Sequence, residues 1–151
     1  MTIYDKMLAQ YKEEHKIATP NAAHEVMQQI ALAGLYRGGF FDHAAFYGGT
    51  CLRLFHDLPR FSEDMDFSLV EKRDDIHLEN YFSAIVKEFE MAGLDVIIDK
   101  KEKKILGRVE SAFLKDSCSV PSFAFATVSF AFQSITEGCI PPPMSIFTIV
   151  S

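Results

Sequence analysis

Residues 46–69 read FYGGTCLRLFHDLPRFSEDMDFSL, and the fold prediction starts from this stretch. Two glycines and a threonine precede a short apolar run, and further on Asp64 and Asp66 stand one residue apart among Met, Phe and Leu. In a strand, side chains at positions i and i+2 point to the same face. Asp64, Asp66 and Ser68 therefore share one face of a predicted strand, and the apolar residues between them form the buried face.

The two aspartates need a physical explanation because neighbouring carboxylates repel each other. Burial increases that cost, so one carboxyl stays protonated unless a cation neutralises both. Mg²⁺ binds carboxylate oxygens and keeps positions for phosphate oxygens and water. For the Asp-x-Asp pair alone, a second interpretation remains open, in which a solvated strand end pairs with Arg53, Arg60 or a nearby lysine.

The Gly48-Gly49-Thr50 turn lies between a predicted strand and a predicted short helix. Glycines allow close approach of the backbone, and the N-terminus of a helix offers free N–H groups to an anion. The turn by itself is also explained by a simple turn and helix cap. A phosphate-binding turn followed by a strand with Asp-x-Asp is more specific, and it predicts a nucleotidyltransferase site.

This stretch resembles the signature of the AbiEii/AbiGii toxin family of nucleotidyltransferases, which belong to bacterial toxin–antitoxin and abortive-infection (phage-defence) systems. The family pattern runs Gly-Gly-Thr/Ser, an apolar pair with a basic residue, a short gap, then Arg-x-Ser-x-Asp-x-Asp-Phe. The matching residues are Gly48, Gly49, Thr50, Leu52, Arg53, Arg60, Ser62, Asp64, Asp66 and Phe67. The resemblance is strong over residues 20–70 and extends to about Lys115.

The resemblance implies that a nucleoside monophosphate is transferred from an NTP to an acceptor, which in some relatives is the end of a tRNA. It also implies Mg²⁺ as the cofactor and a cognate antitoxin as a protein partner. By position, the catalytic and metal-binding residues would be Asp64 and Asp66. The nucleotide-binding residues would be Gly48, Gly49, Thr50, Arg53, Arg60 and Ser62. For Ser62 a strand-capping role is the alternative, and for the two arginines the alternative is pairing with the aspartates.

Hydrophobic periodicity predicts an α/β (α+β) fold, a nucleotidyltransferase-like mixed sheet flanked by helices. Thr19, as a capping residue before Pro20 at the first helical position, predicts a helix start, and Gly93 predicts a helix end. The expected helices are 4–16, 20–36, 49–57 and 75–93. The expected strands are 44–48, 64–70, 94–99 and 104–115, the last two as a hairpin.

The character of the chain changes after Lys115, where only Asp116 and Glu137 are charged. We therefore expect a nucleotidyltransferase core over residues 1–116 and an atypical tail over residues 117–151. The tail is either a strand near residues 123–132 with a loose end, or the product of a truncated or frame-altered gene.

Family members carry a third carboxylate on a later strand, and neither Glu110, in the predicted hairpin, nor Glu137 fits that place well. The alternative function is thus a truncated or inactive family member that binds nucleotide or antitoxin without catalysis. A different metal phosphoesterase also fits the aspartates but leaves the Gly-Gly-Thr turn without a role.

Global composition agrees with one cytoplasmic domain. The chain has 151 residues and a formal net charge of −6, which gives no overall positive field for nucleic acid or an anionic membrane. Its three cysteines form no CxxC pair, as expected in a reducing compartment. The N-terminus has no secretory pattern and no apolar run reaches the length of a membrane span, so we expect a soluble protein.

Overall fold

The computed structural model describes residues 1–62, 64–71, 75–101, 109–116 and 128–133. The longer helices are α1 (Ile3–His15), α2 (Thr19–Arg37), α3 (Gly48–His56) and α4 (Phe82–Ala92), with two 3₁₀ turns, η1 (Phe40–Asp42) and η2 (Leu78–Tyr81). The strands are β1 (Ala44–Tyr47), β2 (Asp64–Leu69), β3 (Val96–Lys101), β4 (Val109–Asp116) and β5 (Val128–Gln133).

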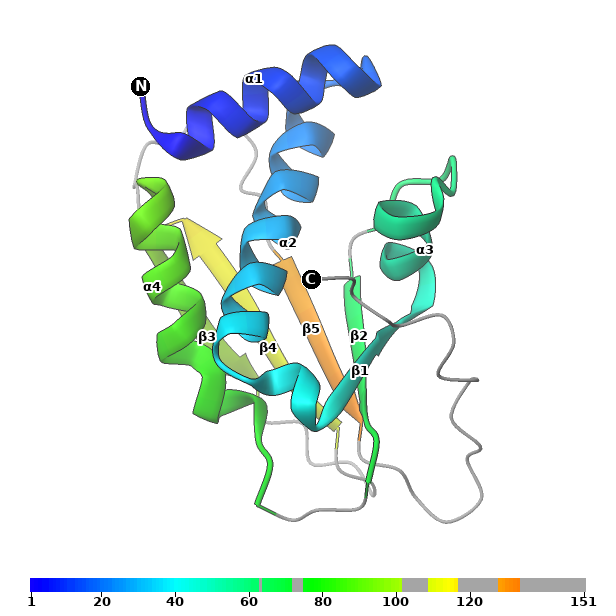
Figure 1. Ribbon diagram of the computed structural model, residues 1–151, viewed down its shortest axis with the longest axis vertical. Helices are drawn as coiled ribbons and strands as arrows, with labels where there is room; N and C mark the ends of the chain where they lie inside the picture. The colour runs from blue at the N-terminus through cyan, green and yellow to red at the C-terminus, as the bar shows by residue number, and fades with distance from the viewer. Residues whose placement is uncertain (63, 72–74, 102–108, 117–127, 134–151) are drawn as a thin grey trace.

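The five strands form one sheet in the order β1-β2-β5-β4-β3. β2 and β5 run parallel, while β1–β2, β4–β5 and β3–β4 are antiparallel. Helices α2 and α4 lie side by side over one face of this sheet, α1 crosses their ends, and α3 stands beside β1 and β2 (Figure 1). The predicted mixed sheet flanked by helices is confirmed.

The core lies between β2 and the helix pair α2 and α4. Phe40, Phe67 and Phe89 are completely buried, and the rings of Phe40 and Phe67 meet edge to face with centroids 5.2 Å apart. A Cβ added to Gly34 of α2 would lie 2.8 Å from the Cα of Ile85 in α4, so only glycine allows this close helix contact. The position of α2 relative to α4 is therefore well determined by packing.

Most predicted elements are confirmed within a few residues, with two local differences. Thr19 is the first residue of α2 and Ala18 occupies the N-cap without a side-chain hydrogen bond, so the prediction that Thr19 caps the helix is wrong. The helix expected over 75–93 is instead η2 followed by α4, and residues 75–77 lie outside both elements. The Asn80 side chain of η2 donates to the Asp75 carbonyl in this preceding segment (3.2 Å). Gly93, at φ +88°, ends α4 as predicted.

The hairpin of β3 and β4 is confirmed, although residues 104–108 of its expected second strand lie outside the described residues. β5 overlaps the strand expected near 123–132, and the first part of that segment lies outside them as well. β5 follows the boundary expected at residue 116 and pairs with both β2 and β4. The division of the chain at that residue stays a prediction. Within the described ranges, no helix is both long and apolar enough to cross a membrane.

Candidate active site

The two faces of β2 differ in exposure as the sequence predicts. Asp64 is exposed and Asp66 and Ser68 are half-buried, whereas the alternating residues Met65, Phe67 and Leu69 are buried. The apolar face packs into the core, so the carboxylates of Asp64 and Asp66 are left on the opposite face of the strand.

The turn after β1 lies directly against Asp66. Tyr47 pairs with Asp66 in the antiparallel register, so α3 begins beside this aspartate. Gly48 has φ +83°, a conformation that favours glycine, and a Cβ at this position would lie 2.6 Å from Oδ2 of Asp66. Glycine is needed at position 48 for two reasons: the backbone angle is unfavourable for other residues, and the Asp66 carboxylate leaves no room for a Cβ.

Gly49 faces Ser62 and Arg60. A Cβ at Gly49 would lie 3.1 Å from the Ser62 hydroxyl and 3.9 Å from Nη2 of Arg60. Arg60 is exposed, so its guanidinium stands at the turn with access to solvent. Of the two arginines in the motif, Arg60 is the one that lies next to the Gly-Gly turn.

Thr50 connects α3 to β2 from the buried side. Its hydroxyl donates to the backbone carbonyl of Asp64 and lies 2.8 Å from the hydroxyl of Ser62, and the residue is completely buried. The turn and the aspartate strand are therefore held together by direct hydrogen bonds.

The N-terminus of α3 lies where the turn meets β2. Its N-cap, Tyr47, makes no side-chain hydrogen bond to the helix. The first N–H groups of a helix have no partners within the helix, and with the helix dipole they favour an anion. The arrangement can therefore bind a phosphate at the turn, close to a pair of carboxylates.

The electrostatics of the aspartate pair indicate a place for a cation. Burial, and then the charge of Asp64, raise the pKa of Asp66 above its usual value. The structure shows no group of three or more His, Cys, Asp or Glu residues suited to a metal within the part of the chain that it describes. Two carboxylates still fit Mg²⁺, which commonly takes one or two from the protein and its other ligands from phosphate and water.

The strand next to the aspartates adds no carboxylate in register. Ser129 and Ala131 of β5 pair with Asp64 and Asp66. Glu110 lies in β4, which β5 separates from β2. Glu137 lies outside the described residues. The candidate site in the described residues therefore consists of two carboxylates and the turn.

Arg53 pairs with Glu25 of α2. Its Nε lies 2.6 Å from Oε1 of Glu25, and its Nη1 donates to the carbonyl of Leu58 (2.9 Å). Glu25 is completely buried and also accepts a hydrogen bond from the Tyr11 hydroxyl (2.8 Å). The alternative in which Arg53 pairs with an aspartate is not what the structure shows.

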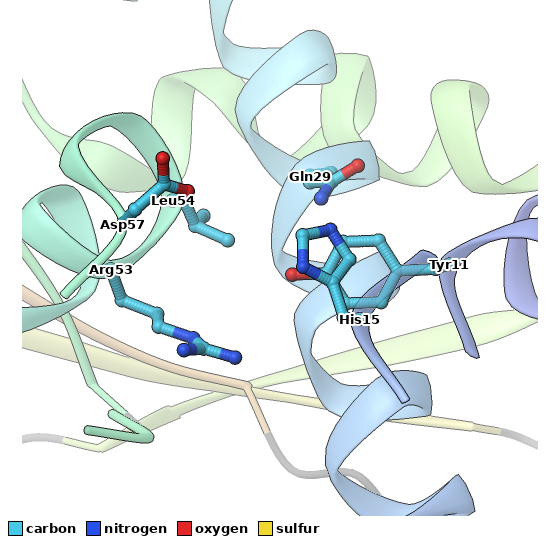
Figure 2. Close-up of a pocket in the computed structure, with 6 residues that line it drawn as sticks. All are labelled: Tyr11, His15, Gln29, Arg53, Leu54 and Asp57. Atoms are coloured by element: carbon cyan, nitrogen blue, oxygen red, sulfur yellow. The ribbon is translucent and has the colours of Figure 1, made fainter. Parts of the chain in front are cut away.

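A cavity of about 260 Å³ opens beside this ion pair, lined by residues of α1, α2 and α3 and by Asp57 directly after α3. Figure 2 shows Tyr11 and His15 of α1 facing α3 across the opening. Its lining consists of Tyr11, His15, Gln29, Arg53, Leu54 and Asp57. The residues that line the cavity do not include Asp64, Asp66, Gly48 or Gly49.

Glu25 and Gln28 are the functional candidates that the sequence did not indicate. Both are completely buried, and Nε2 of Gln28 donates to the Ser62 carbonyl (3.1 Å). The available signal was a polar residue on the apolar side of α2, next to Val26 and Met27. That pattern marks a buried polar contact but does not identify its partner.

Most of the chain matches one protein-family model. Residues 30–146 match the family model described as "Nucleotidyl transferase AbiEii toxin, Type IV TA system". A search of curated protein sequences gave no significant match.

Two solved structures resemble this fold. MenT4, a nucleotidyltransferase toxin from Mycobacterium tuberculosis H37Rv, has a TM-score of 0.50 and 19% identity, over 88% of this chain and 44% of that one. A candidate nucleotidyltransferase from H. pylori has a TM-score of 0.49 and 20% identity, over 78% of this chain and 46% of that one. The chain thus spans less than half the length of either structure.

Proposed function

Because this chain belongs to the AbiEii family of nucleotidyl transferase toxins, we propose that it transfers a nucleoside monophosphate from an NTP to an acceptor such as tRNA. The observation that carries the proposal is the contact between Gly48 and Asp66, where a Cβ would lie 2.6 Å from the carboxylate. The contact supports the proposal because a turn with free helix N–H groups meets an anionic strand face, an arrangement that a metal-bound phosphate would satisfy.

Each predicted catalytic or nucleotide-binding residue has a role in this proposal. Asp64 and Asp66 hold Mg²⁺, which when bound neutralises charge on the transferred phosphoryl group. The backbone of Gly48 and Gly49 and the start of α3 bind the phosphates. Arg60, exposed beside Gly49, adds positive charge there.

The roles of Thr50, Ser62 and Arg53 follow from their contacts within the protein. Thr50 and Ser62 join the turn to β2 through their hydroxyls, so they support the phosphate site from within. Arg53, paired with Glu25, holds α3 against α2.

The proposed reaction also implies binding partners and a cellular compartment. NTP and tRNA are both present in the cytoplasm, so the enzyme would act there, and a toxin of this family would be restrained by a cognate antitoxin protein.

A second candidate function is binding of nucleotide or antitoxin without catalysis. The register of β5 favours it, because Ser129 and Ala131 stand beside Asp64 and Asp66 where a carboxylate would complete a metal site. Without a third carboxylate, activation of the acceptor hydroxyl would be weaker.

Transfer of label from α-³²P NTPs, each supplied in turn with Mg²⁺ and total tRNA, tests both functions. The parent chain is compared with Asp64→Ala/Asp66→Ala and with Glu13→Ala/Glu14→Ala, which removes two exposed carboxylates from α1. We expect labelled RNA with the parent and the α1 variant, and none with the aspartate variant. Binding of Mg²⁺ and NTP without labelled RNA would support the second function. A folded chain that binds no Mg²⁺–NTP would contradict both nucleotidyl transfer and nucleotide binding.

A further inference from the structure

We propose that α2 positions the two halves of the candidate site, with Glu25 holding α3 and Gln28 holding the segment that leads into β2. Both are positioning residues in this view, since neither touches a reacting group. The inference rests on the proposed function, and it assigns roles to two residues outside the sequence motif.

The first step concerns the charge on Glu25. A carboxylate with no exposed surface is costly unless its charge is compensated. Here Arg53 contacts it through Nε at 2.6 Å and Nη2 at 3.5 Å, and the Tyr11 hydroxyl donates to Oε2 at 2.8 Å. The Arg53 side chain is only 16% exposed, so both ion-pair partners are largely removed from water. Such a pair has strict geometric requirements.

The second step follows Arg53 along α3. Arg53 lies three residues after Thr50, so the two side chains share one face of the helix. An ion pair at Arg53 therefore fixes the rotation of the helix whose first turn contains Gly48, Gly49 and Thr50.

The third step concerns Gln28, three residues after Glu25 on the same face of α2. Its Nε2 donates to the carbonyl of Ser62, two residues before Asp64. One face of α2 thus contacts α3 through Glu25 and the entry to β2 through Gln28. The packing of Gly34 against Ile85 fixes α2 itself, so the helix can act as a rigid reference for both halves.

We expect loss of these α2 contacts to change the geometry of the candidate site more than the stability of the protein. Replacing a buried ion pair by apolar residues is often neutral for stability, so stability alone does not explain such a pair. Group transfer is more demanding, because a displacement of about 1 Å can reduce the rate about 100-fold. We therefore expect changes in α2 to reduce kcat by a larger factor than they raise KM for NTP.

The variants that test this are Glu25→Gln, which keeps the shape of the side chain and removes its charge, and Gln28→Met, which leaves the ion pair intact. Glu88→Gln is the matched control. Glu88 of α4 forms an ion pair with Arg37 (3.2 Å), which lies at the C-terminal end of α2. We expect kcat to fall about tenfold or more in the first two variants and to be unchanged in the control. Urea unfolding confirms that each chain is folded under assay conditions.

A second readout does not require activity. Cys51 of α3 is buried, and burial raises the pKa of its thiol to about 11. In a chain with Cys118→Ser and Cys139→Ser, its reaction with a thiol reagent reports loosening of α3. We expect Glu25→Gln to increase this rate severalfold and Glu88→Gln to leave it unchanged.

The two readouts separate the two proposals. If the parent chain transfers no label, the proposed function fails, and the Cys51 rate still shows whether Glu25 holds α3. Parent-like kcat and Cys51 reactivity in folded Glu25→Gln would overturn the role of Glu25, and parent-like kcat in folded Gln28→Met would overturn that of Gln28. If Glu25→Gln does not fold, Gln28→Met decides the inference through kcat.

Discussion

At the scale of single residues, ionising both Asp64 and Asp66 has an electrostatic free-energy cost that a bound cation would remove. Burial and the neighbouring Asp64 raise the pKa of Asp66 above 3.8. A group with a raised pKa in the folded state contributes stability below its unfolded pKa, and that contribution is lost as pH rises through the folded pKa. At neutral pH the ionised Asp66 therefore destabilises the metal-free chain.

Asp66→Asn removes that charge and one proposed ligand together. We expect the free energy of unfolding of the metal-free protein at pH 7 to be unchanged or higher, with the difference from the parent disappearing near pH 3. Mg²⁺-dependent nucleotide binding, measured by calorimetry, should be abolished. A large loss of stability in the metal-free variant would instead indicate that Asp66 has a structural role.

At the scale of elements, the turn between β1 and α3 is tested by Gly48→Ala. Its positive φ costs a non-glycine residue about 1–2 kcal/mol, and the new Cβ would displace the Asp66 carboxylate. We expect a loss of stability of about that size together with loss of Mg²⁺–NTP binding. Urea unfolding and calorimetry measure the two effects.

Gly39→Ala is the matched control for this prediction. Gly39 has nearly the same φ, +82°, but a Cβ there would lie 3.4 Å from Oδ2 of Asp42, an ordinary contact. It should lose similar stability and keep nucleotide binding. Equal loss of binding in both variants would mean that backbone strain, rather than the approach to Asp66, explains the effect.

Elements also show which parts of the molecule the sequence could predict. The faces of β2 follow from alternation, and one local motif predicted that the Gly-Gly-Thr turn and the two aspartates belong to one site. The direct approach of Gly48 to Asp66 was not predicted. The partner of Arg53 could not be predicted, because Glu25 is 28 positions away and the contact depends on how α2 packs beside α3. The place of β5 was unpredictable for the same reason, since strand pairing between distant segments leaves no local pattern.

At the scale of the whole molecule, β5 connects two halves of the sheet. β1 and β2 lie on one side of it and β3 and β4 on the other, so β2 meets β4 only through β5. The family match also continues past the boundary expected at residue 116, to residue 146. Both observations argue that residues after 116 belong to the folding unit that carries the aspartates.

A chain that ends at residue 116 tests this argument against the predicted boundary. It would lack β5, leaving β2 and β4 each without a hydrogen-bonded neighbour on one side. We expect no cooperative urea transition and no binding of Mg²⁺–NTP, whereas a chain ending at residue 133 keeps β5 and should retain cooperative unfolding. If the 1–116 chain unfolds cooperatively and binds Mg²⁺–NTP, the boundary at 116 is correct. The aspartate site would then depend only on β1, α3, β2 and the support of α2.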